Sequence, residues 1–255
     1  MKYLNLFWFN NINFGDNLNY FLIKMISKKE IVLCKDIQNE EHYVCIGSIL
    51  NWATEKSVVW GAGFAHKKDV VRPNVKIDMV RGPISAEIAS KCGVKNIPTT
   101  YADPSLLLSK FYPLLKQEKK HRLGLIPHYV DQKYIFDNFS QLSPEIKIIN
   151  VFDYPEKVIN EINDCEMIIS SSLHGLIVAN SYGMPSYRIK ITDLVGGDGM
   201  KFSDYFNSVG IKDYEPIPIN EILNKQVSKL LKEIPVIRPK IEFNKILSTC
   251  PFLEN

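Results

Sequence analysis

The chain has 255 residues, of which 45% are hydrophobic and 11% aromatic, so it can form one large hydrophobic core or two moderate ones. Its net charge of +3 is small and dispersed, which argues against nucleic acid as the main partner. The five cysteines have neither CxxC nor metal-ligand spacing, and their odd number favours reduced thiols in a cytoplasmic protein. No apolar run is long enough to span a bilayer, so membrane contact, if any, is expected to be peripheral.

Strands and helices alternate along the first 113 residues. Apolar runs bounded by turn residues predict strands over 3–9, 30–33, 43–46, 57–60 and 76–80. Helices are predicted over 17–26 and 83–91, where Pro83 suits a first turn and Gly93 a helix end. The charge-dense segment 114–122 is interpreted as a solvated linker rather than a binding patch.

The alternation restarts after the linker. Strands are predicted over 123–126, 146–151, 167–169 and 187–191, and helices over 131–140, 155–163, 220–234 and 242–247. Two such series indicate an α/β fold with two Rossmann-like domains that face a cleft. We therefore expect an N-terminal domain over 1–113, a C-terminal domain over 123–234 and a helical segment over 235–255.

The segment from Glu166 to Pro185 is the most informative part of the chain. A buried strand runs into three serines, and a helix then continues to Gly183. His174 is therefore expected in the first turn of a helix at the carboxyl end of a strand, where α/β proteins bind ligands and where anions are favoured. An empty site should hold His174 neutral, whereas a bound phosphate would favour its charged form. A capping or purely structural histidine is the alternative.

Two further loops are expected at the same edge. His128 follows the first strand of the second half, so it can converge with His174, although either histidine alone is often structural. In the first half, Asn13, Gly15, Asp16 and Asn17 form the first strand-to-helix turn, which suits a phosphate or sugar site. A simple helix start explains this turn equally well.

Four basic residues stand near the expected ends of strands. Arg81 can offer a bidentate fork to a carboxylate or phosphate, although a surface salt bridge is the usual fate of one arginine. Arg188 and Lys190 lead into a glycine-rich stretch that ends at Lys201. Those glycines can form a mobile loop over an anion or a plain surface loop.

Together these motifs resemble the polysaccharide pyruvyltransferase family, in the family's order and over most of the chain. The residues that carry the resemblance are Asn13-Phe-Gly-Asp16, Trp60-Gly-Ala-Gly63, Val80-Arg-Gly-Pro-Ile-Ser85, Asp103-Pro104, Ser172-Leu-His-Gly-Leu176, Gly183-Met-Pro185 and Lys201-Phe-Ser-Asp-Tyr205. One position departs from the pattern, because many members carry arginine where this chain has Ser172. Another cation must then hold the donor, and Arg81, Arg188, Lys190 and Lys201 are the candidates.

The resemblance implies a fold similar to GT-B glycosyltransferases, with the acceptor in the N-terminal domain and the donor in the C-terminal domain. The implied reaction transfers pyruvate from phosphoenolpyruvate to two sugar hydroxyls and needs no metal or cofactor. His174 matches the functional histidine of the family, with His128 and Asp16 as further acid–base candidates. Donor binding is expected from the start of the His174 helix (Ser171, Ser172, Leu173, Gly175), and acceptor binding from Asn13, Gly15 and Asn17.

The expected acceptor is a lipid-linked glycan or oligosaccharide at the inner face of the plasma membrane. A GT-B glycosyltransferase with a nucleotide-sugar donor is the first alternative. That class usually carries a glutamate after its His-Gly motif, whereas residues 176–182 contain no acid here. A carbohydrate-binding protein that has lost catalysis is the second alternative, which Ser172 leaves open.

Overall fold

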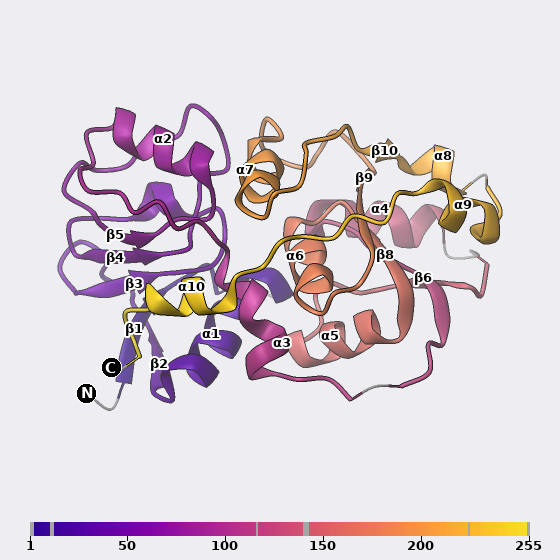
Figure 1. Cartoon of the computed structure of the whole chain (residues 1–255), viewed down its shortest axis with the longest axis horizontal. Coiled ribbons are helices and arrows are strands. Elements are labelled where there is room, and N and C mark those ends of the chain that lie inside the picture. Colours follow the sequence, from indigo (N-terminus) through magenta and orange to yellow (C-terminus); the bar gives the residue numbers. More distant parts are fainter. Residues whose placement is uncertain (1–2, 11–12, 116, 140–142, 224, 254–255) are drawn as a thin grey trace.

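The computed structural model describes residues 3–10, 13–115, 117–139, 143–223 and 225–253 (Figure 1). Two five-stranded sheets with strands all parallel form its two halves. The first sheet contains β1 (Tyr3–Phe7), β2 (Glu30–Leu33), β3 (His42–Val44), β4 (Ser57–Trp60) and β5 (Lys76–Met79). The second contains β6 (His121–Ile126), β7 (Ile146–Ile148), β8 (Cys165–Ser170), β9 (Ser186–Lys190) and β10 (Ile217–Pro218). The expectation of two Rossmann-like sheets is confirmed.

Both sheets have the same strand order. It is β2-β1-β3-β4-β5 in the first half and β7-β6-β8-β9-β10 in the second, which is the flavodoxin-like order 2-1-3-4-5 counted within each half. The direction of strand addition reverses between β1 and β3, and again between β6 and β8. Ligands of such sheets bind beyond the carboxyl ends of the strands at these reversal points.

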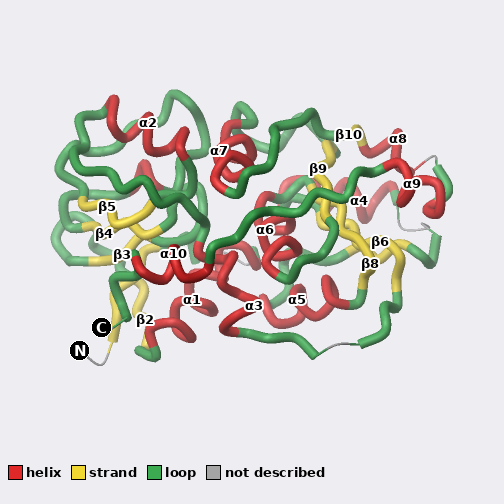
Figure 2. The backbone as a smooth tube through the Cα atoms, in the orientation of Figure 1, coloured by secondary structure: helices red, strands yellow, loops and turns green. Residues whose placement is uncertain are grey.

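Helices cover the sheets and connect their strands (Figure 2). They are α1 (Phe14–Ser27), α2 (Pro83–Lys91), α3 (Leu108–Phe111), α4 (Tyr129–Asn138), α5 (Pro155–Asn163), α6 (Leu173–Ser181), α7 (Met200–Ser208), α8 (Ile219–Leu223), α9 (Val227–Glu233) and α10 (Phe243–Ser248), with 3₁₀ turns η1 (Leu50–Trp52) and η2 (Pro104–Leu107). Because α6 is apolar on nearly every side, it is buried; it packs on β8 and on η2 and α3 from the first half. One hydrophobic core cluster therefore runs through both halves.

The C-terminal segment returns to the first half. It passes from α9 over the second half to α10, which lies against the first sheet (Figure 1). There the indole N–H of Trp60 donates to the Thr249 hydroxyl at 3.0 Å, and the Phe252 ring packs edge-on against Trp60 and Tyr43. The two halves are thus joined by the end of the chain as well as by the segment before β6.

Element boundaries follow local capping. Helices α2 and α5 have the predicted bounds, but α1 begins three residues earlier than expected. The reason is that Asn13, rather than Asp16 or Asn17, is the N-cap, and its side-chain oxygen accepts from the Gly15 N–H at 3.1 Å. The last residue of the predicted helix 131–140 lies outside the described residues.

Strand β6 begins at His121, so the last two residues of the predicted linker are already strand. The other domain bounds and the likeness to GT-B enzymes stay predictions. Among the described residues, no helix is both long enough and apolar enough to cross a membrane.

Candidate functional site

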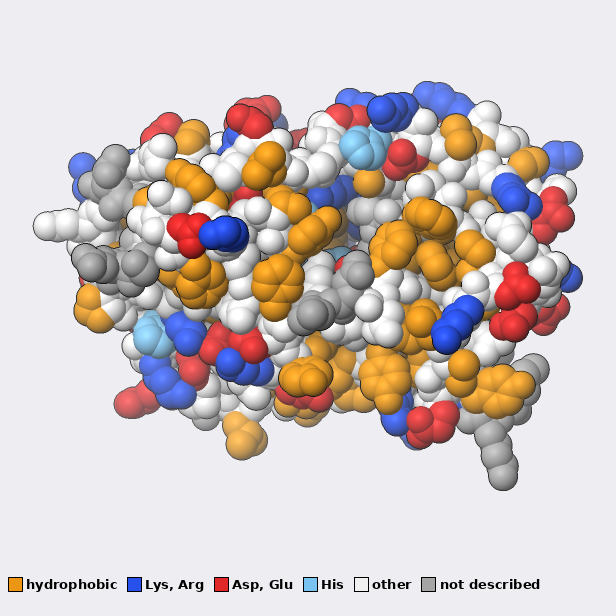
Figure 3. Space-filling model, turned by 180° about the vertical axis from the view of Figure 1, so that it is seen from behind, with side chains coloured by type: hydrophobic (Ala, Val, Ile, Leu, Met, Phe, Trp, Pro, Cys, Tyr) orange, Lys and Arg blue, Asp and Glu red, His pale blue; other side chains and the backbone are white. Residues whose placement is uncertain are grey.

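The carboxyl ends of the two sheets meet where α1 and α6 begin. His174, in the first turn of α6, reaches across to the first half: a Cβ atom on Gly15 would lie 2.4 Å from its Nδ1, and one on Gly47 would lie 4.0 Å from its Cε1. Only glycine at position 15 leaves room for this ring. Seen from behind, the molecule is hollowed between the halves, and hydrophobic side chains gather around the hollow (Figure 3). The structure thus brings His174 and Gly15 together.

His174 faces a buried carboxylate. Its Nε2 lies 3.8 Å from Oδ2 of Asp103, and within the described residues both atoms are buried without a hydrogen-bond partner. The other carboxylate oxygen of Asp103 accepts from the Ser105 N–H at 2.9 Å, which fixes the side chain at the start of η2. Such a pair of unsatisfied groups in contact points to a proton-transfer site.

Burial and neighbouring charges shift the pKa of His174 in opposite directions. Burial lowers the pKa of its imidazole, the Asp103 carboxylate raises it, and the charges of Arg81 and Lys201 lower it further. The net shift is downward, so His174 is neutral in the empty site at neutral pH. An incoming anion would raise this pKa, because negative charge stabilises the imidazolium.

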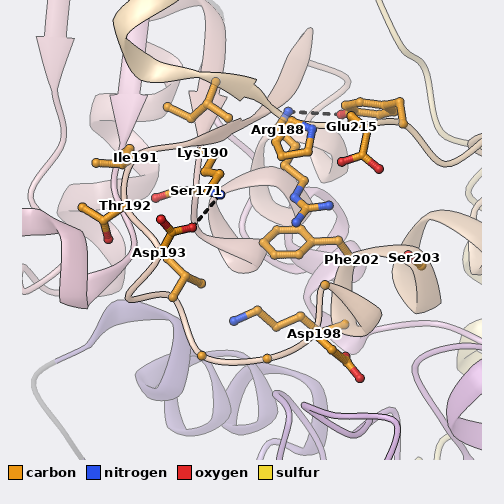
Figure 4. A pocket seen from close by; sticks show the side chains of 18 of the residues that line it. Ser171, Arg188, Lys190, Ile191, Thr192, Asp193, Asp198, Phe202, Ser203 and Glu215 are labelled. Carbon is orange, nitrogen blue, oxygen red and sulfur yellow. Dashed lines mark hydrogen bonds and ion pairs between the residues drawn. The ribbon is translucent and has the colours of Figure 1, made fainter.

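Beside β9 lies a cavity of about 370 Å³ lined by Arg188, Lys201 and Ser171 (Figure 4). The guanidinium carbon of Arg188 stacks 4.0 Å from the ring centroid of Phe202, and Nζ of Lys201 lies 5.5 Å from the same ring. Within the described part of the chain, neither cation forms an ion pair. Burial, followed by the charges of Arg81 and Arg188, lowers the pKa of Lys201 to about 8. Lys201 is buried and Arg188 is half-buried, and among the described residues neither is ion-paired with a carboxylate of the cavity wall (Asp193, Asp198, Asp213, Glu215), which indicates an anion site.

The glycine-rich loop borders this cavity and is tied to the first half. The Asp198 carboxylate accepts from the backbone N–H of Lys67 at 3.0 Å and from that of Met200 at 3.1 Å. A Cβ on Gly197 would lie 3.0 Å from the Ala65 carbonyl oxygen, so the loop lies tightly against the first half. Lys190 lies on the rim, 52% exposed and paired with a neighbouring aspartate.

His128 is the N-cap of α4 and lies next to Ser171 of the cavity wall. Its backbone N–H donates to the Ser171 hydroxyl at 2.8 Å, and that hydroxyl donates to the Asp131 carboxylate at 2.7 Å. Burial, then the charges of Lys201 and His174, lower the pKa of His128 to about 3. The ring is therefore neutral at physiological pH, which disfavours it as the acid of the empty site.

Arg81, the first of the four predicted cations, is fully buried between the halves. Its Nε lies 3.1 Å from the Asp204 carboxylate of α7, and its two Nη atoms donate to the Ser48 hydroxyl at 2.8 Å and the Phe64 carbonyl at 2.6 Å. Asp204 also accepts from the Ser85 N–H and hydroxyl at 2.9 and 2.6 Å. This geometry connects α7 to the first half, and donor binding by Arg81 stays a prediction.

The remaining predicted residues divide between two places. Asn13 donates to the Asp16 carboxylate at 3.4 Å beside the His174 contact, whereas Asn17 lines a separate groove on the far side of α1. At the start of α6, Ser172 is the N-cap residue, Leu173 is buried, and Gly175 allows close packing, because a Cβ there would lie 2.4 Å from the Ser170 hydroxyl. Their donor and acceptor roles stay predictions.

Sequence reasoning did not identify Asp103, Asp131 or Phe202 as site residues. In the sequence, Asp103-Pro104 is only one of the motifs of the family resemblance, with no role assigned to it, and Asp131 is the first residue of the predicted helix 131–140. The one available signal for Asp103 is its place before a proline and an apolar run, where an aspartate caps a buried element. Its contact with His174 depends on the packing of η2 against α6.

Comparisons with known proteins place the chain in a family. The family model described as polysaccharide pyruvyl transferase matches residues 13–192, which include Asn13, His128 and His174. An uncharacterized protein of Acanthamoeba polyphaga mimivirus is 28% identical over 81% of this chain and 74% of its own length. The succinoglycan biosynthesis protein ExoV of Rhizobium meliloti is 23% identical over 82% of this chain and 65% of its own length.

Among solved structures, a functionally uncharacterized protein of Klebsiella pneumoniae matches with a TM-score of 0.48 and 11% identity, over 81% of this chain and 88% of its own. The family match covers well over half of the chain and includes the reversal point between β6 and β8, where His128 and His174 lie. This chain belongs to the polysaccharide pyruvyl transferase family.

Proposed function

We propose that this protein transfers the pyruvyl group of phosphoenolpyruvate to two hydroxyls of a sugar, forming a ketal in polysaccharide biosynthesis. The family supports a pyruvyltransferase role, and one relative is named for succinoglycan biosynthesis. The observation that carries the choice of donor is the cavity with the buried Lys201 and the half-buried Arg188, neither of them ion-paired among the described residues, in the half that holds His174. A lipid-linked acceptor and a cytoplasmic, peripheral membrane location are further parts of this proposal.

The chemistry of the donor suits this cavity. Phosphoenolpyruvate carries a phosphate and a carboxylate, and a guanidinium matches the planar geometry of either group, whereas a lysine supplies a compact charge. Stacking on Phe202 fixes the guanidinium plane of Arg188, so less freedom is lost when the donor binds. In this account Arg188 and Lys201 replace the arginine that many family members carry at the position of Ser172.

The reaction requires two hydroxyl protons to move. Protonation of the donor's methylene carbon makes C2 electrophilic, and the first sugar hydroxyl adds there. The second hydroxyl then replaces phosphate at C2 and closes the ketal. In sum, one hydroxyl proton ends on the new methyl group and the other leaves with phosphate. We assign the proton transfer to His174, because Asp103 contacts Nε2 and stabilises the imidazolium. That leaves Nδ1, beside Gly15, to exchange a proton with substrate. Asp16 is the candidate base for the acceptor.

Release of phosphate tests this function. Wild-type protein incubated with phosphoenolpyruvate and a panel of oligosaccharides should release phosphate only when an acceptor is present, and mass spectrometry should find the pyruvyl group on that acceptor. Transfer of a sugar from a nucleotide sugar, without release of phosphate from phosphoenolpyruvate, would favour the glycosyltransferase alternative. Binding of glycan without either reaction would favour a protein that has lost catalysis.

The affinity for phosphoenolpyruvate should fall as pH rises above about 8. The pKa of Lys201 is lowered to about 8, so its charge is present below that pH and is lost above it. Calorimetric titrations between pH 7 and pH 9.5 would measure this decline. The variant Lys201→Arg keeps its charge over the whole range, so its affinity should vary little. A wild-type affinity that rises through this range would exclude Lys201 as a donor ligand.

A further inference from the structure

A second concave surface lies between α1 and α5, with a volume of about 700 Å³. Its walls come from both halves: Trp8, Asn17 and Tyr20 from the first, and Phe152 and Tyr154 from the loop before α5. This volume is within the range of sites that bind small molecules. We call this surface the aromatic groove.

The side chains of the aromatic groove suit an uncharged sugar. Tyr154 is 81% exposed, Phe152 43% and Tyr20 42%; Lys24 lies over the Tyr20 ring, so the other two rings are the ones open to the apolar C–H face of a sugar ring. The amide of Asn17 and the carboxylate of Glu156 can hydrogen-bond its hydroxyls. Among the described lining residues there is no lysine or arginine, which argues against an anionic lipid headgroup or phosphate.

One polar atom of the aromatic groove lacks a partner. Trp8 is 6% exposed, and its indole N–H is buried with no hydrogen-bond acceptor in the described structure. An unsatisfied buried donor is costly and uncommon in native proteins. Its ring lines the aromatic groove 6.4 Å from that of Tyr20, so binding that uncovers this N–H would let a sugar hydroxyl, or a water, accept from it.

We propose that the aromatic groove binds uncharged sugar units of the acceptor glycan, at a distance from the pair of hydroxyls that receives pyruvate. This inference rests on the proposed function. Gly15 touches His174, whereas Asn17 lines the aromatic groove, and two residues apart on a helix point about 200° apart. The reaction centre and the aromatic groove therefore flank the first turn of α1. The acceptor is thus an oligosaccharide or longer glycan rather than a single sugar.

An array of uncharged and acidic oligosaccharides, printed beside their component monosaccharides, tests this proposal with labelled full-length protein. Wild type should bind at least one uncharged oligosaccharide more tightly than its monosaccharides. Tyr154→Ala should weaken that binding about threefold to tenfold through loss of an aromatic face. Trp8→Phe keeps a ring but removes the N–H, and it should weaken binding by about fivefold. Tyr134→Ala, an exposed tyrosine of α4 outside the aromatic groove, is the matched control.

Calorimetry with phosphoenolpyruvate distinguishes a failure of the glycan-binding proposal from a failure of the proposed function. If the donor binds but no uncharged oligosaccharide does, or if Tyr154→Ala and Tyr134→Ala bind glycan equally, the aromatic groove has no role in glycan binding and the donor assignment stands. Stronger binding to anionic phospholipid vesicles than to glycans would also overturn the proposal. If the donor does not bind, the proposed function fails, whatever the array shows.

Discussion

Replacement of His174 by alanine is expected to lower pyruvyl-transfer turnover by about 10²- to 10⁴-fold, the range of general acid–base catalysis. His174 reaches from the second half to Gly15 and Asp103 of the first, so its loss removes the contact of the imidazole with both. Initial rates of phosphate release measure the loss. His121→Ala is the matched control, because His121 lies at the start of β6, away from the cavity. Near wild-type turnover in His174→Ala would contradict the assignment.

The companion variant Asp103→Asn tests whether Asp103 acts on the pKa of His174 or only on the fold. The Asp103 carboxylate raises the pKa of His174, so its loss should lower that pKa. If protonated His174 is the acid, activity falls as pH rises through its pKa, and in Asp103→Asn this fall should move to lower pH. A lower rate with an unchanged pH profile would show that Asp103 acts only on the fold.

The largest expected effect on stability is that of Asp204→Ala, at about 3–5 kcal/mol of unfolding free energy. The variant leaves the buried guanidinium of Arg81 without its carboxylate and leaves the Ser85 hydroxyl and N–H without their acceptor. Urea denaturation measures the loss. Asp193→Ala, which breaks only the exposed pair with Lys190, should change stability by less than about 0.5 kcal/mol.

A double variant tests whether the unpaired charge of Arg81 causes this loss of stability. The double variant Arg81→Met with Asp204→Leu removes both charges, so it should be more stable than Asp204→Ala alone. If Asp204→Ala cost less than about 1 kcal/mol, the buried ion pair would not hold α7 against the first half. The same helix carries Lys201 and Phe202, so weakened donor binding should accompany the loss of stability.

The repeated pattern of strand and helix is strong enough to predict both sheets from the sequence. Helices α2 and α5 match their predicted bounds because proline at the first turn and a clear apolar face define them. The place of His174 follows from the serine run after β8 in the same way. The start of α1 is less predictable, since Asn13, Asp16 and Asn17 are all competent caps and only one of them is used.

Contacts between the halves could not be predicted from the sequence. Asp103 and His174 are 71 positions apart, and Arg81 and Asp204 are 123 apart, so only the packing of the halves brings them together. For the same reason, the sequence alone cannot distinguish the roles of the four basic residues. In the structure Arg81 is paired and buried, Lys190 is paired and exposed, and Arg188 and Lys201 enclose the cavity.

Calorimetric titration with phosphoenolpyruvate and, separately, with a panel of nucleotide sugars distinguishes a pyruvyltransferase from a glycosyltransferase. Wild type is expected to bind phosphoenolpyruvate, and Arg188→Met is expected to bind it about 10- to 100-fold more weakly, because a charged hydrogen-bond donor is lost. Lys190→Met is the matched control on the rim of the same cavity, where the cation is already paired. Binding of a nucleotide sugar but not of phosphoenolpyruvate would show that the protein is not a pyruvyltransferase, and equal affinity in Arg188→Met and wild type would show that Arg188 does not hold the donor.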